Sequence, residues 1–341
     1  MTRLIVASLV LTWACSAPAT LSELSTAERR ADAGDVDGAL AAYREAQTKC
    51  GALRPARRAK ATCASALLGE AEVLDHAGRT RGAIDAYLAI PRRVSEDPTT
   101  SATATQRAGE LLLRAGDVTA AWTALWRVVT DWPDEQPAGD ALRVLLEDGR
   151  RRDARALADQ ISKLLPPLAE TSVADNLVWT LADLNEHELA NAAAARGYYD
   201  RIPVEFPNSG LRDDARWHAA RLSKLLGDPK GAVERLRALL ATREVAFLSG
   251  SYFSVWLDDA QLELARILRD ELEDLPGALA AFERLPKHYP ASILRDDALF
   301  ELAVTHARAG DRTKACATFV KLAAQSPDSK YLARRAELPC P

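Results

Sequence analysis

Three pairs of neighbouring aspartates are the first candidates for chemistry in this chain: Asp213/Asp214, Asp258/Asp259 and Asp296/Asp297. Two acids close together are used in acid/base catalysis and in binding divalent metals. Each pair also stands where a helix is expected to begin, and acids there interact favourably with the helix dipole and satisfy free N–H groups. We therefore expect these pairs to open helices and not to form a catalytic or metal site.

A second candidate is His187, which lies in the run Asn185-Glu186-His187-Glu188. A zinc motif would need another histidine one helical turn away, and the sequence has none there. The sequence also contains no Ser-His-Asp pattern, nucleophile elbow, phosphate-binding glycine loop or dinucleotide fingerprint. We expect a surface or turn histidine, no metal, no cofactor and no catalysis. The alternative is an accessory enzyme or a carbohydrate-binding protein whose site is assembled from dispersed residues.

The five cysteines are Cys15, Cys50, Cys63, Cys316 and Cys340. Without Cys15 their number is even, as expected of a chain that folds in an oxidising compartment. Four cysteines allow three connectivities, and the local one, Cys50–Cys63 with Cys316–Cys340, closes the shortest loops. The alternative is four buried free thiols. None of the cysteines has the spacing of a metal site.

The elements that must position these residues are helices. Hydrophobic residues make up 48% of the 341 residues and aromatics 6%, while Gly and Pro occur 17 times each, which favours short helices separated by turns. The 44 basic and 48 acidic residues give a net charge of −4 and are interspersed along the chain. This distribution argues against nucleic acid as a partner.

A helix-hairpin repeat is clearest near the C-terminus, in Leu299, Leu302, Ala303, His306, Gly310, Ala315, Phe319 and Pro327. Apolar residues three and four apart give each helix a buried stripe, Gly310 allows the turn, Ala315 allows close approach, and Pro327 ends the second helix. Similar markers recur backwards through Pro290, Pro207, Pro166 and Pro133 to Gly34, and the turn and alanine positions of successive repeats lie about 33 to 46 residues apart. The sequence thus contains about eight candidate repeats between Leu21 and Pro327.

This pattern resembles the tetratricopeptide repeat family. The resemblance implies an all-α fold, a right-handed α-solenoid of about eight helix hairpins over residues 21–328. Residues 329–341 are expected to form a capping helix and tail, with the helix over 331–337. Two joints between repeats, residues 206–215 and 289–298, share an aromatic-Pro-x-Ser segment and also resemble the β-barrel assembly lipoprotein and the Tol-Pal coordinator of bacterial envelopes.

The resemblance implies a non-catalytic scaffold that binds proteins or peptides of the cell envelope in a groove lined by the first helices. Trp217 and Phe300 occupy equivalent places there, and Arg221 and Lys224 follow Trp217 on the same helix. These four residues are the predicted binding groove, with packing of the aromatics as the alternative. The aromatic segment 247–256 is expected to pack as part of an elongated helix or to form an exposed contact patch.

The N-terminus has the layout of a signal peptide, with Arg3 before an apolar run from Leu4 to Ala14. Residues 11–15 resemble the lipobox of bacterial lipoproteins. This implies a leader over residues 1–14, lipidation of Cys15, a linker over 15–20 and an outer-membrane lipoprotein facing the periplasm. The membrane partner would then be reached through the lipid. The alternative is cleavage after Ala19, which would release a soluble periplasmic protein.

Overall fold

The computed structural model describes residues 22–52, 56–242, 254–338 and 340. Within these ranges the regular structure consists of sixteen α-helices and two short 3-10 helices. Consecutive α-helices form eight hairpins, from α1/α2 to α15/α16, which confirms the predicted all-α array of about eight hairpins. By its internal contacts the chain divides into two units, one up to Val144 and one from Leu145.

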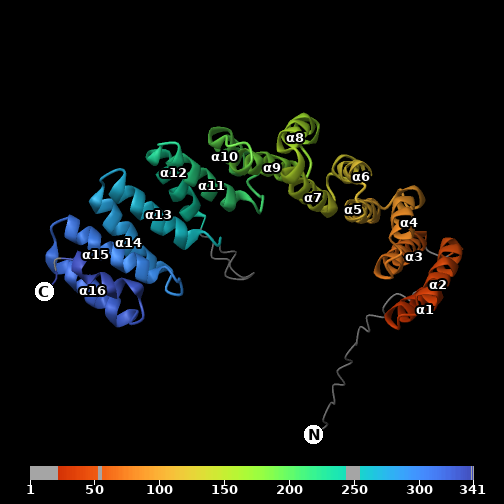
Figure 1. Cartoon of the computed structure of the whole chain (residues 1–341), viewed down its shortest axis with the longest axis horizontal. Helices are drawn as coiled ribbons and strands as arrows, with labels where there is room; N and C mark the ends of the chain where they lie inside the picture. Colours follow the sequence, from red (N-terminus) through yellow and green to blue (C-terminus); the bar gives the residue numbers. More distant parts are fainter. Residues whose placement is uncertain (1–21, 53–55, 243–253, 339, 341) are drawn as a thin grey trace, which may run out of the picture. The chain divides into compact units, whose positions relative to one another are not determined.

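The first unit is built from hairpins whose helices pack on their neighbours in chain order (Figure 1). Its core is a continuous cluster of alanines with leucine, isoleucine and tyrosine side chains. Tyr87, one of the largest, is fully buried, and burial raises its pKa to about 12. The helices are α1 (Ser22–Asp32), α2 (Val36–Lys49), η1 (Cys50–Ala52), α3 (Ala56–His76), α4 (Thr80–Arg93), α5 (Pro98–Arg114) and α6 (Val118–Asp131).

The boundary between the units falls within α7 (Gln136–Arg152). The second unit continues as a row of hairpins in chain order (Figure 1), again with leucine, alanine and aromatic side chains in the core. Its further helices are α8 (Ala154–Leu168), α9 (Ala174–His187), α10 (Ala192–Glu205), α11 (Arg212–Leu225), α12 (Pro229–Ala241), α13 (Leu257–Asp270), α14 (Leu275–His288), α15 (Arg295–Arg308), α16 (Arg312–Gln325) and η2 (Lys330–Glu337).

The turns inside most hairpins share a chemistry. In six of the eight hairpins a residue with positive φ follows the first helix, and an aspartate or asparagine at the next cap accepts a hydrogen bond from the N–H three residues later. In α3/α4, Gly78 has positive φ but Arg79 makes no side-chain cap, and in α7/α8, Asp153 caps the helix without a positive-φ residue before it. At the last hairpin these are Gly310, with φ 80°, and Asp311. The capping acids and amides of this kind are Asp35, Asp117, Asp153, Asn191, Asp228, Asp274 and Asp311.

Close packing of the two helices depends on small residues, as predicted. Ala315 of α16 is fully buried. In α5, a Cβ atom added to Gly109 would lie 2.8 Å from the side chain of Leu125 on α6, so this position accepts no larger residue without movement. Glycine and alanine therefore set the distance between paired helices.

The structure corrects the prediction for Pro166 and specifies the helix type of the tail. Pro166 was expected to mark the end of a second helix, but α8 continues through Pro166 and Pro167 to Leu168, so both prolines lie in its last turn, where the helix loses only the hydrogen bonds of their missing N–H groups. The tail was expected to form a short helix over 331–337, and residues Lys330–Glu337 form the 3-10 helix η2, with a kink at Arg334. By contrast, Pro327 lies just beyond the C-cap of α16, where it was predicted to end the helix.

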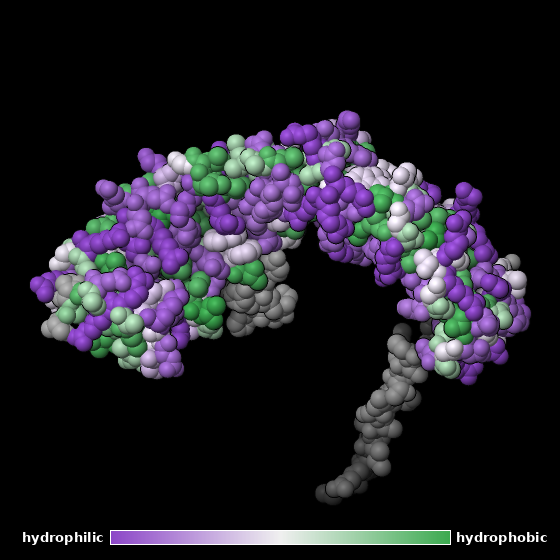
Figure 2. All heavy atoms as spheres, viewed as in Figure 1, coloured by the Kyte–Doolittle hydropathy of each residue, from purple (hydrophilic) through white to green (hydrophobic). Residues whose placement is uncertain are grey.

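No helix among the described residues has the length and apolar character needed to cross a bilayer. Hydrophilic side chains cover much of the visible face, and hydrophobic residues appear in small scattered groups (Figure 2). The predicted leader, the linker and Cys15 lie outside the described residues.

Candidate functional site

The first helices of the second unit share a pattern at their starts. The second residue of α9, α11, α13 and α15 is an aspartate, and its carboxylate accepts a hydrogen bond from a hydroxyl in the joint that ends the same hairpin. The pairs are Asp175–Ser209 (2.6 Å), Asp213–Thr242 (3.1 Å), Asp258–Ser292 (2.6 Å) and Asp296–Ser329 (2.7 Å). Each pair ties the two ends of one hairpin together.

These contacts refine the prediction for the aspartate pairs. The aspartates lie in the first helical turn, where the dipole favours them, but the N-cap residues themselves are apolar and make no side-chain cap. The joint serine satisfies a further N–H group: Ser292 Oγ accepts a hydrogen bond from the Leu294 N–H at 3.0 Å while donating to Asp258. The prediction that these acids would satisfy free N–H groups is confirmed in two helices, where Asp258 accepts from the Asp259 N–H at 3.1 Å and Asp296 accepts from the Asp297 N–H at 2.9 Å.

Trp217, predicted to lie in the binding groove, is half-buried in an aromatic stack. The ring of Trp256, which begins the next hairpin, stacks on it at 5.3 Å between centroids. The Trp256 indole N–H donates to the carboxylate of Asp214, the second acid of its pair. Trp217 and Asp214 together thus form a slot that receives the first residue of the following repeat.

Phe300 occupies the same place in the last hairpin and is 1% exposed. Tyr331 of η2 stacks on it at 4.6 Å, and the Tyr331 hydroxyl donates to Asp297. Burial and this hydrogen bond raise the pKa of Tyr331 to about 12. Because Tyr331 covers the ring, Phe300 is closed to a partner, which corrects its assignment as a groove residue.

In α13 the slot is built from aliphatic residues. Leu262 stands where the aromatic ring would be, and Leu294, which has no polar group to donate, takes the place of the incoming aromatic residue. The carboxylate of Asp259 consequently makes no hydrogen bond to any described residue. Burial, together with the charge of Asp258, raises the pKa of Asp259.

Lys224, another predicted groove residue, is already paired. Its Nζ lies 2.6 Å from Glu263 and 3.5 Å from Glu271. Burial lowers the pKa of Lys224, but the hydrogen bonds and charges of these two glutamates outweigh burial and raise it. Arg221, one turn earlier, is exposed and forms no ion pair with a described acid.

Ion pairs of this type join successive first helices along the second unit. His218 Nδ1 lies 2.9 Å from Glu186, and the buried guanidinium of Arg269 pairs with Glu301. The hydrogen bond and charge of His218 lower the pKa of Glu186 against the opposing effect of its burial. Of the four predicted groove residues, Arg221 is therefore the one charged group that forms no ion pair with a described residue.

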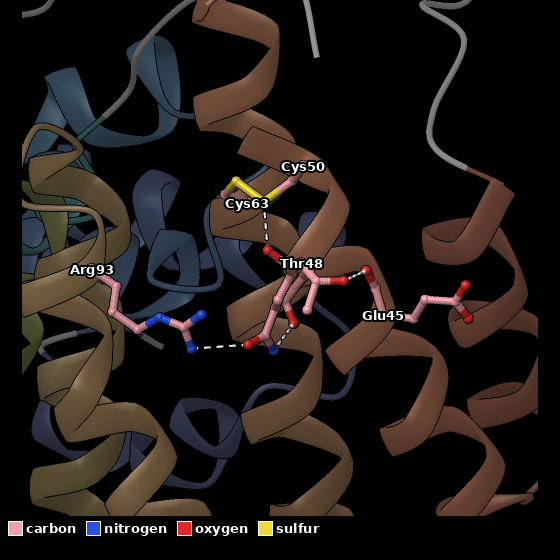
Figure 3. The surroundings of a disulfide bond; sticks show 7 residues. Glu45, Thr48, Cys50, Cys63 and Arg93 are labelled. Carbon is pink, nitrogen blue, oxygen red and sulfur yellow. Dashed lines mark hydrogen bonds between the residues drawn. A yellow bond between two sulfur atoms is a disulfide. The ribbon is translucent and has the colours of Figure 1, made fainter. Parts of the chain in front are cut away.

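Disulfide bonds join Cys50 to Cys63 and Cys316 to Cys340, the local one of the three connectivities. Figure 3 shows the first, which connects the end of α2 to α3. Near it, a depression of about 600 Å³ is lined by Lys60, Arg93, Glu96 and other residues, with Lys60 and Glu96 paired to each other. The second disulfide holds the tail on α16 beside the Phe300 slot.

No group of histidine, cysteine and acidic residues with metal-binding geometry occurs in the described part of the chain. His187 is the last residue of α9 and is exposed, as predicted. Most of the aromatic segment 247–256 lies outside the described residues. In its final part Val255 is 75% exposed and Trp256 is in the stack with Trp217.

The joint hydroxyls are the feature that sequence reasoning missed. The shared aromatic-Pro-x-Ser segment at residues 206–209 and 289–292 was the available signal, since an identical serine in two joints points to a shared contact. The partner of this serine could not be recognised from the sequence, because the aspartate lies 34 residues earlier in both cases.

Comparisons with known proteins agree with this repeat geometry. A profile of the tetratricopeptide repeat matches residues 259–292 and 297–329. No curated protein sequence matches the chain. Among solved structures, the C-terminal part of a TPR repeat-containing protein from Cytophaga hutchinsonii is 12% identical, with 90% of this chain and 96% of that chain covered and a TM-score of 0.42.

Two further similar structures are the TPR protein YrrB and MamA. YrrB, described as having an unusual peptide-binding site, is 15% identical over 75% of this chain and 100% of that chain, with a TM-score of 0.39. MamA is 13% identical over 66% of this chain and 92% of that chain, with a TM-score of 0.38. The profile matches coincide with hairpins α13/α14 and α15/α16, so this chain carries tetratricopeptide repeats within an array of helix hairpins.

Proposed function

We propose that the protein is a non-catalytic scaffold of the bacterial cell envelope that holds protein partners and is anchored through a lipid on Cys15. The observation that carries the scaffold role is the tandem array of tetratricopeptide hairpins. Stacked hairpins present long exposed faces built from successive helices, which suits the binding of extended or helical segments.

The two disulfides support export. Disulfides form and persist in oxidising compartments such as the periplasm and are rare in the cytosol. Both bonds lie at sequence-local sites, Cys50–Cys63 and Cys316–Cys340, and link elements that are already neighbours. Together with the lipobox-like residues 11–15, they support placing the mature chain on the periplasmic side of the outer membrane.

The location is tested by fractionating cells that express the wild type or Cys15→Ala, with Ser16→Ala as the control. Mass spectrometry of the N-terminal peptide identifies the mature end. We expect a lipidated Cys15 and membrane association in wild type and Ser16→Ala, and loss of the lipid in Cys15→Ala. A soluble protein beginning after Ala19 would overturn the anchor, and an intact Met1 would overturn export.

The scaffold role is tested by crosslinking in intact cells. A photoreactive residue at position 221 reports on the first-helix face, and one at Val204, 78% exposed on α10, reports on the second-helix face. We expect defined envelope proteins to crosslink at one or both positions. Absence of any specific crosslinked protein from either position would contradict a scaffold.

A further inference from the structure

Several basic side chains on second helices of the second unit form no ion pair with a described acidic residue. The groove between α12 and α14 has a volume of about 570 Å³ and is lined by Arg237 and Arg284, with no acid among its lining residues. The next groove, between α14 and α16, has a volume of about 630 Å³ and contains Lys287, Lys314 and Lys321 with a single acid, Glu283.

The same face is neutralised one hairpin earlier. Between α10 and α12, Nε and Nη2 of the Arg235 guanidinium donate to the Asp200 carboxylate at 2.8 and 2.6 Å. A second pair joins the same helices, with Arg196 lying 3.3 Å from Asp228. Paired arginines of this kind are structural, because each cation has its anion within the fold.

In the two basic grooves this arrangement is absent. Arg237, Arg284, Lys287 and Lys321 are exposed and form no ion pair with any described residue, while Lys314 is held by Asp311 at 3.2 Å. This concentration of unpaired positive charge occurs in a chain whose net charge is −4. Each groove also has leucines of the intervening first helix in its floor, Leu264 and Leu268 in one case.

We propose that these two neighbouring grooves form a docking surface for an acidic segment of a partner protein. The unpaired cations select carboxylates by charge complementarity, and such patches steer association as well as orient the partner. A concave groove with leucines at its base fits apolar side chains placed between acids. It fits a flat lipid surface less well, because the latter contacts only groups that project outward.

This surface deepens the proposed scaffold role and differs from the first-helix face. On the first-helix face the charges of Lys224 and Arg269 are satisfied by the protein's own glutamates. In the two basic grooves of the second-helix face, Arg237, Arg284, Lys287 and Lys321 have no such partner among the described residues and are left to be satisfied by another molecule. The contrast arises within one unit, so it does not depend on how the two units are arranged.

The test uses the full mature chain and a triple charge reversal, Arg237→Glu with Arg284→Glu and Lys321→Glu. The matched control is Arg155→Glu with Lys163→Glu and Lys230→Glu, three exposed cations outside the grooves with the same change in charge. Circular dichroism establishes that both variants fold. The probes are a labelled peptide of alternating glutamate and leucine, vesicles containing phosphatidylglycerol, and a labelled oligonucleotide.

We expect the wild type and the control to bind the acidic peptide with an affinity that falls as salt rises. The groove variant should bind at least about tenfold more weakly, since three attractive contacts become repulsive. Equal peptide binding by groove and control variants would overturn the proposal. So would binding of vesicles or oligonucleotide, but not of the peptide, by the grooves.

A crosslinked pull-down with the same variants separates this proposal from the scaffold role. If the groove variant retains every partner of the wild type, the docking surface is wrong and the scaffold stands. If the wild type itself has no partner, the scaffold role fails.

Discussion

The hairpin turns place single residues in the left-handed region of the backbone. Gly310 has φ 80° and open space around the position of a Cβ atom. Glycine is therefore required there by the backbone conformation and not by a close neighbour. Gly197, in the middle of α10, has ordinary helical φ and equally open surroundings. The two glycines thus differ in backbone conformation alone.

We predict opposite effects of alanine at these two positions. Gly310→Ala should lower the free energy of unfolding by about 1–2 kcal/mol, because a side chain disfavours the left-handed region. Gly197→Ala should raise it by about 0.5–1 kcal/mol, because glycine is a poor helix former. Urea titration followed by circular dichroism measures both, and a destabilising Gly197→Ala would contradict the assignment.

Asp259 gives a prediction about pH. Burial and the charge of Asp258 raise its pKa, so the folded state binds this proton more tightly than the unfolded chain does. The stabilisation is complete below the ordinary aspartate pKa of 3.8 and is lost as pH rises through the higher folded value. Asp259→Asn, which removes the unpaired carboxylate, should therefore stabilise the protein at neutral pH, with the gain shrinking as pH falls through this window.

Thermal unfolding measured across acidic to neutral pH tests this expectation. Asp258→Ala is the contrasting variant, because Asp258 accepts the Ser292 hydroxyl at 2.6 Å and its loss should destabilise the hairpin. A pH-independent effect of Asp259→Asn would show that its carboxylate is not perturbed.

At the scale of elements, the first helices α11, α13 and α15 each offer a slot to the start of the segment that follows. Trp256 fills the slot on α11, and Tyr331 fills the slot on α15. The tail η2 thereby takes the position that a further repeat would occupy, and the Cys316–Cys340 bond holds the chain just beyond it. End repeats of such arrays need a cap of this kind, because an uncovered stacking face exposes apolar surface.

Removing the ring of Tyr331 should uncover this slot. Tyr331→Ala is expected to cost about 2–4 kcal/mol, since a large buried side chain is lost and Phe300 becomes exposed. Tyr331→Phe keeps the stack and loses one hydrogen bond, so about 1 kcal/mol is expected. Hydrogen exchange of α15 and α16 amides measures both changes; equal protection in the two variants would exclude stacking as the main contribution.

At the scale of the whole molecule, stability is expected to be local. In repeat arrays each hairpin contacts mainly its neighbours, so a change propagates poorly along the chain. The disulfides lie in different units, Cys50–Cys63 in the first and Cys316–Cys340 in the second. Each bond therefore acts on the unit that contains it.

We predict that replacing both cysteines of one disulfide by serine destabilises its own unit by about 3 kcal/mol, through the greater entropy of the unfolded chain. Hydrogen exchange should show loss of protection near the missing bond and little change in the other unit. A uniform loss of protection across both units would indicate that the array unfolds as one cooperative body.

The sequence alone determined the class of fold and the number of hairpins. Local patterns encode both: Gly310 and Asp311 define a turn and a cap, and Ala315 allows close approach within a few residues of chain. Even the equivalence of Trp217 and Phe300 could be read from spacing, because both are the sixth residue of a first helix.

Only the tertiary structure decided which of these residues are available to a partner. Phe300 is closed by Tyr331, and Lys224 is neutralised by Glu263, a residue 39 positions later on another helix. Spacing within a repeat places a side chain on a helix face, but exposure and free charge depend on what the next hairpin brings against that face. The basic grooves were hidden from sequence reasoning for the same reason, since the acids missing there would have come from neighbouring helices.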